Sequence, residues 1–158
     1  MKAHVMNFVA ATLMLAGNAA ADEYRAGSIR ISDPWTRATP QGAQVAGGFM
    51  RIENTGNESD RLIGGSMPLA GQFQVHEMTM VGDVMRMREV TGGLDIKAGA
   101  RVELKPGSYH VMFMQLKEPI RQGGPIRGTL VFEKAGNVDI QYNVQPIGWQ
   151  PPPSKSGQ

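Results

Sequence analysis

The chain has 158 residues, a length typical of a single domain. Sixteen lysines and arginines are set against fourteen aspartates and glutamates, giving a formal net charge of +2 at pH 7. This small excess is spread along the chain, which argues against a nucleic-acid binder that depends on a basic stripe. The chain has no cysteine, which excludes thiol-disulfide exchange, a blue-copper centre with a cysteine ligand and any cysteine-based zinc site.

The first 21 residues have the features of a signal peptide. Lys2 supplies a short positive region, and the mostly apolar stretch 5–16 is too short to span a bilayer as a helix of about 20 residues. The run Ala-Ala-Ala at 19–21 matches a signal-peptidase site, so we expect cleavage before Asp22. An amphipathic N-terminal helix of a cytosolic protein is the weaker alternative. We therefore expect a periplasmic protein with no stable membrane insertion after cleavage.

The rest of the sequence is rich in turn residues. The chain's 20 glycines and 10 prolines favour short strands joined by turns over a helical bundle. From residue 24 to 148 no helical periodicity persists over about eleven residues, and short apolar or alternating runs are separated by turn residues. The pattern predicts strands at 29–33, 45–54, 61–66, 73–80, 84–90, 101–104, 110–116, 128–133 and 138–144.

Two hairpins are the most clearly marked of these elements. Residues 73–90 fold back at Val-Gly-Asp, 81–83, and residues 128–144 fold back at Ala-Gly-Asn, 135–137. Short strands with frequent turn signals are typical of β-sandwiches. The sequence therefore predicts an all-β fold, an antiparallel Greek-key β-sandwich, over residues 22–148.

Features outside the strands have structural interpretations. Asp33-Pro34 is expected to end the first strand in a turn. Trp35 and Trp149, near the two ends of the domain, are interpreted as packing residues. The proline-rich segment 149–158 is predicted to be a disordered tail.

The histidines and methionines are concentrated in one part of the chain. Beyond residue 21 there are two histidines, and six of the eight methionines lie between residues 74 and 115. Alternate residues of a strand share a face, so three pairs of side chains project together: His76 with Met78, Met85 with Met87, and His110 with Met112. The turn at Gly82 folds the first two pairs toward each other.

A cluster of histidine and methionine suits one metal ion in particular. Thioethers are soft neutral donors and imidazole is a borderline one, so the set suits Cu(I), which needs no charged ligand and accepts few ligands. Zinc or iron would favour cysteine, histidine or carboxylate, and calcium or magnesium would need an oxygen cage. Core packing is the alternative, because methionine commonly fills gaps in hydrophobic cores. Joint clustering in an exported chain without thiols favours the copper site.

At these residues the chain resembles the periplasmic copper chaperones of the PCu(A)C family. The family signature is a His, ten intervening residues, a Met, about twenty-one more residues and then His-x-Met. Here Met87 follows His76 after ten residues, and His110-Val111-Met112 follows after twenty-two. The resemblance extends over residues 29 to about 144.

The resemblance implies a cupredoxin-like β-sandwich that binds one Cu(I) near its surface through His76, Met87, His110 and Met112. It implies a copper chaperone that delivers copper to the copper centre of cytochrome c oxidase or to a Sco-like protein. A periplasmic copper-sequestering or tolerance protein without a dedicated client is the alternative. We expect a monomer.

An enzyme is the least favoured class. The sequence shows no Gly-rich phosphate loop and no Ser-His-Asp arrangement. Copper monooxygenases that chelate the metal through an N-terminal histidine would need that residue at the new N-terminus, where the predicted cleavage leaves Asp22. The roles of four further methionines stay open at this stage: Met78, Met80, Met85 and Met114.

Overall fold

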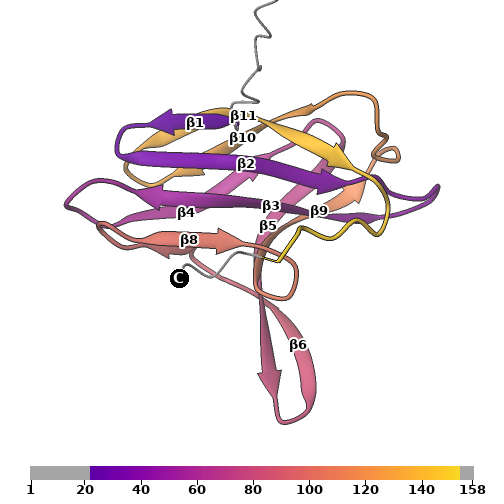
Figure 1. The fold of residues 1–158 in the computed structure, drawn as a ribbon, viewed down its shortest axis with the longest axis horizontal. Coiled ribbons are helices and arrows are strands. Elements are labelled where there is room, and N and C mark those ends of the chain that lie inside the picture. The colour runs from indigo at the N-terminus through magenta and orange to yellow at the C-terminus, as the bar shows by residue number, and fades with distance from the viewer. Residues whose placement is uncertain (1–21, 154–158) are drawn as a thin grey trace, which may run out of the picture.

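The computed structural model describes residues 22–153, and within them the fold is all-β (Figure 1). The predicted signal peptide and residues 154–158 of the predicted tail lie outside the described residues. No helix among the described residues is long and apolar enough to cross a membrane. Its strands are β1 (Glu23–Ala26), β2 (Ile29–Arg37), β3 (Val45–Asn54), β4 (Asp60–Ser66), β5 (Ala70–Val81), β6 (Val84–Glu89), β7 (Leu94–Ile96), β8 (Arg101–Leu104), β9 (Tyr109–Leu116), β10 (Ile126–Phe132) and β11 (Gly136–Gln145).

Every predicted strand is present, and the described residues contain two more, β1 and β7. These two strands have four and three residues. Runs this short give too few alternations to be recognised from the sequence, and their positions are set by pairing to the longer strands β2 and β4.

The strands are hydrogen-bonded in the order β6-β5-β9-β8-β3-β2-β11-β10-β4-β7, with β1 added on β2. One core fills the space between the two halves of this sheet, with buried residues from β2, β3 and β9 against others from β4, β10 and β11. Most pairings are antiparallel, as predicted. Within residues 22–153 the exceptions are β11 on β2 and the short contact of β8 with β9, which are parallel.

The turn predicted at Asp33-Pro34 is wrong, because β2 continues through it to Arg37. Asp33 has φ of 52° and the register against β3 shifts between Ser32 and Trp35, so one extra residue is accommodated as a bulge. A bulge tolerates proline, which has no N–H to donate. The extra residue also exchanges the two faces, so Trp35 lies outside the core, opposite Phe49.

The β5–β6 hairpin extends beyond the body of the sandwich (Figure 1). Val81 pairs with Val84, which leaves Gly82 and Asp83 as a two-residue loop. Gly82 has φ of 61°, a left-handed conformation that glycine adopts without strain. Every residue of β6 is exposed. The predicted hairpin is confirmed, and its outer part contributes nothing to the core.

The chain after β11 returns to the outer side of β2. The Trp149 ring packs edge-on against Trp35 with ring centroids 4.8 Å apart, and Arg37 Nε donates to the Trp149 carbonyl oxygen at 2.6 Å. The packing role predicted for the two tryptophans is confirmed. The first residues of the segment assigned to the tail, 149–153, therefore include a side chain that is packed against the domain.

Candidate metal centre

The two histidines beyond residue 21 are neighbours across two strands. In the antiparallel pairing of β5 with β9, His76 lies directly opposite His110, and their ring centroids are 5.7 Å apart. The side chains are only 8% and 7% exposed. Residues 34 positions apart in the sequence are thus brought into a buried pair.

This pair lies on the outer face of the sheet. The strand neighbours Val75 and Val111 point into the core, so the alternate residues project the other way. Phe49 of β3 lies beside His110, with ring centroids 6.4 Å apart, and stacks on Trp35 at 4.3 Å. These aromatic rings exclude water from a face that would otherwise be exposed.

Each imidazole is oriented by an oxygen that can only accept a hydrogen bond. His76 Nε2 lies 2.8 Å from Gln74 Oε1, and His110 Nδ1 lies 3.3 Å from the Ser108 carbonyl oxygen. The N–H of each ring therefore donates to that oxygen, leaving lone pairs on His76 Nδ1 and His110 Nε2. His76 Nδ1 is buried and has no hydrogen-bond partner among the described residues. A bound metal ion would satisfy this atom, so the residues present fit such an ion.

The electrostatic environment favours neutral His110. Burial lowers the pKa of the His110 imidazole below its ordinary value of 6.5, the hydrogen bond to the Ser108 carbonyl opposes the shift, and a charge on His76 would lower the pKa further. Only neutral imidazole has a lone pair for a metal ion. The site therefore keeps this donor ready for binding.

The two predicted methionine ligands lie on the same face of the sheet as the histidines, but at different places along the strands. Met112 lies opposite Gln74, two residues beyond His110 along β9, and is half-buried. Met87 lies opposite Met78 on the other side of β5, one step toward the hairpin turn, and is 50% exposed. Of the four predicted ligands, the two histidines are direct cross-strand partners, and the methionines flank them on opposite sides.

Several residues of this site were not predicted from the sequence. Gln74 is two residues before His76, so strand alternation could have placed it beside that histidine. Phe49 gives no such signal, because its position depends on which strand pairs with β9. Gly47 lies opposite Met112, and a Cβ there would meet the Phe49 ring at 2.8 Å, so glycine is what allows this ring to lie along β3.

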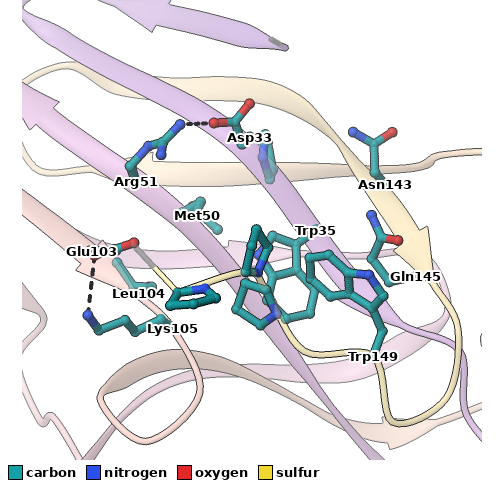
Figure 2. Close-up of a pocket in the computed structure, with 14 residues that line it drawn as sticks. Asp33, Trp35, Met50, Arg51, Glu103, Leu104, Lys105, Asn143, Gln145 and Trp149 are labelled. Carbon is teal, nitrogen blue, oxygen red and sulfur yellow. Dashed lines mark hydrogen bonds and ion pairs between the residues drawn. The ribbon is translucent and has the colours of Figure 1, made fainter. Parts of the chain in front are cut away.

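Within residues 22–153, no group of three or more His, Cys, Asp or Glu side chains could hold a metal ion. The largest pocket described, about 660 Å³, lies elsewhere, where β2, β3 and β8 meet the C-terminal segment. Figure 2 shows Trp35 and Trp149 in this pocket together with the Arg51–Asp33 ion pair. The histidines do not line this pocket, so the candidate metal centre is the face of β5, β6 and β9 that carries the histidines and methionines.

The model of the LpqE-like family, described as "Putative lipoprotein LpqE-like", matches residues 29–144. The chain belongs to this family. A curated relative, "Putative lipoprotein Lxx21020" of Leifsonia xyli subsp. xyli (strain CTCB07), is 30% identical over 121 residues, which cover 77% of this chain and 72% of that protein.

Solved structures similar to this LpqE-like chain include PCuAC domains. The copper-bound PCuAC domain from PmoF2 is 30% identical, with a TM-score of 0.68 over 79% of this chain and 98% of that domain. The Cu(I) form of DR1885 from Deinococcus radiodurans is 22% identical, with a TM-score of 0.58 over 82% of this chain and 85% of that one, and shows the same fold. The resemblance to the PCu(A)C family and the cupredoxin-like fold are confirmed.

Proposed function

We propose that this LpqE-like protein is an exported copper chaperone that binds one Cu(I) through His76, His110, Met87 and Met112. The observation that carries the proposal is the buried histidine pair with two free lone pairs, one of them on an atom without a partner among the described residues. Two imidazoles and two thioethers form a neutral, soft donor set that suits Cu(I). The copper-bound PCuAC domain at 30% identity supports the same cargo.

The residues around the histidines have defined tasks in this proposal. Gln74 and Ser108 hold the two rings so that His76 Nδ1 and His110 Nε2 can bind the ion. Phe49 and Trp35 limit the access of water. A site of low polarity stabilises the ion of lower charge, so it favours Cu(I) over Cu(II).

Exposure of the methionines favours delivery over permanent storage. Met87 is half-exposed on the projecting hairpin, so an incoming ligand can replace its thioether while the buried histidines still hold the ion. Thioethers bind Cu(I) less firmly than thiolates do, so copper would pass to a thiolate-containing acceptor. The copper centre of cytochrome c oxidase and a Sco-like protein are the acceptors we propose.

Export and location belong to the same proposal. The relative named as a lipoprotein supports an exported protein, and we place this chain in the periplasm after removal of residues 1–21. We propose that it acts there as a monomer and not as an enzyme. Intact mass of the exported protein tests the processing, with Asp22 expected at the N-terminus; a retained leader in the soluble fraction would contradict it.

A transfer experiment distinguishes the chaperone from a sequestering protein. The protein is loaded anaerobically with Cu(I), analysed for metal, mixed with an apo oxidase copper domain and separated from it. One copper per chain before mixing, and copper in the acceptor afterwards, would support delivery. Copper that stays on the protein, together with normal oxidase assembly in a deletion strain at limiting copper, would favour sequestration.

A further inference from the structure

Four methionines continue the metal-binding face from the histidines to the tip of the β5–β6 hairpin. Met78 lies opposite Met87. Two residues nearer the turn, Met80 lies opposite Met85. All four have the strand parity of His76, so they share its face. The metal centre proposed above uses Met87 alone from this set, and the outermost pair is unassigned.

The register brings each pair of thioethers close together. Val90 N donates to Val75 O at 2.8 Å, so residues 75 and 90 are a hydrogen-bonded pair. Hydrogen-bonded and non-hydrogen-bonded pairs alternate along an antiparallel ladder, which makes Met80 and Met85 a non-hydrogen-bonded pair with Cα atoms about 4.5 Å apart. Side chains of such pairs are the nearest neighbours across a sheet.

That separation suits a two-coordinate ion. Metal–sulfur bonds of about 2.3 Å, as in zinc sites, put two sulfur atoms roughly 4.6 Å apart when they face each other across an ion. The unbranched methionine side chain has three rotatable bonds and adapts readily to such a distance.

Packing does not explain the outer pair. Met50 and Met67 are buried in the core, but Met80 and Met85 are 59% and 50% exposed. Met80 and Met85 are paired next to the turn of the β5–β6 hairpin, and this hairpin projects from the sandwich (Figure 1). Exposed apolar side chains gathered on one projecting element commonly mark an interaction site.

The surroundings of this pair select a soft ion. Between the histidines and the turn, the face has thioether side chains from both strands, and Glu89 lies level with His76 at the inner end. The charged residues Glu77 and Arg88 pair with each other on the opposite face. Hard cations would find no oxygen cage on this face among the described residues.

We propose that Met80 and Met85 bind a second Cu(I) at the hairpin tip, more weakly than the metal centre, as the site where copper enters and leaves. This inference rests on the proposed function, which makes the histidine pair the destination. Two neutral thioethers hold Cu(I) less firmly than two imidazoles and two thioethers. Met78 and Met87 lie between the two sites, so an ion moves inward by exchanging one ligand at a time.

Titration with Ag(I), a soft monovalent ion that does not change oxidation state here, tests the tip site in the purified protein labelled with ¹³C-methyl methionine. The first equivalent is expected to shift the Met87 and Met112 methyl resonances, and the second to shift Met80 and Met85. A Met80→Leu, Met85→Leu variant keeps the apolar bulk without sulfur and should lose the second equivalent alone. Met114→Leu, on the same face of β9 but away from the tip, is the matched control and should still bind two equivalents of Ag(I).

The outcomes separate this inference from the proposed function. If one equivalent binds and the Met80 and Met85 methyls do not move, the tip site is wrong and the metal centre stands. If the wild type and a His76→Gln, His110→Gln variant bind the ion alike, and only the Met80 and Met85 methyls move in both, the tip site stands and the proposed centre is wrong. Transfer of Cu(I) to a thiolate chelator should be severalfold slower in the double leucine variant, and an unchanged rate would overturn the handover role.

Discussion

The two ends of one strand face are built in opposite ways. At the inner end, His76 and His110 are buried, oriented by Gln74 and Ser108, and covered by Phe49. At the outer end, Met80, Met85 and Met87 are 50–59% exposed and are not members of the core cluster. The same alternation of side chains produces both ends, so the difference arises from what packs over them.

This difference separates two requirements of a metal carrier. In the proposed site, the fixed and buried imidazoles would set the affinity and oxidation state of the ion, because their orientation is determined before it binds. Flexible, exposed thioethers allow access, because they can leave the ion without disturbing the fold. The comparison predicts that substitutions at the inner end change the Cu(I) affinity most, and that those at the outer end change the rate of Cu(I) exchange.

The largest effect is expected at the histidines. His76→Gln or His110→Gln removes a donor of the ion, so Cu(I) affinity should fall by more than the roughly 10- to 100-fold that loss of an outer hydrogen-bond partner costs. Competition against a Cu(I) chelator measures it, with circular dichroism to verify folding. Wild-type affinity in a folded variant would remove that histidine from the site.

The second-largest effect on Cu(I) affinity is expected from loss of a methionine that flanks the histidines. Met87→Leu and Met112→Leu each remove one sulfur donor and keep the apolar volume, so the first Cu(I) should bind at least about tenfold more weakly. Met80→Leu and Met114→Leu should leave that first affinity nearly unchanged. Small and equal effects at all four positions would favour a packing role for these methionines.

A smaller effect is expected when the orientation of His76 is disturbed. Gln74→Leu removes the oxygen that accepts from Nε2, and we expect a decrease of roughly tenfold in Cu(I) affinity. Gln74→Glu keeps an acceptor oxygen at that position and should retain more of the affinity. The same competition assay compares the two variants, and equal losses would show that the hydrogen bond does not orient the ring.

Local patterns in the sequence were sufficient to predict nine of the strands and the faces that β5, β6 and β9 present. Alternation put His76 with Met78 and Met85 with Met87, and the predicted turn at Gly82 folded these two pairs toward each other. The structure adds the register, in which Met78 and Met87 are partners. These features depend on residues a few positions apart. Their physical cause is the two-residue period of a strand, which is visible in a single sequence.

The features of the fold and the site that could not be predicted depend on contacts between residues far apart in the sequence. The pairing of His76 with His110 requires β9 to lie beside β5 although β6, β7 and β8 come between them in the chain. The position of Trp35 depends on a bulge at Asp33, which exchanges the faces of β2. Neither the bulge nor the order of the strands is determined by local propensity, so the aromatic cover of the site was missed.

The smallest effect should come from mild acidification of the metal-free protein. Burial holds the pKa of His110 below 6.5, so above that pH the ring is neutral in both folded and unfolded chains and contributes no pH dependence. Below about pH 6.5 the unfolded chain binds a proton that the folded site resists, so the free energy of unfolding should decrease as the pH falls through the folded pKa. Urea unfolding at a series of pH values should show this decrease in the wild type and a weaker one in His110→Gln. An identical pH dependence in the two proteins would mean that His110 is not the group responsible, and NMR titration of its ring would then show an ordinary pKa.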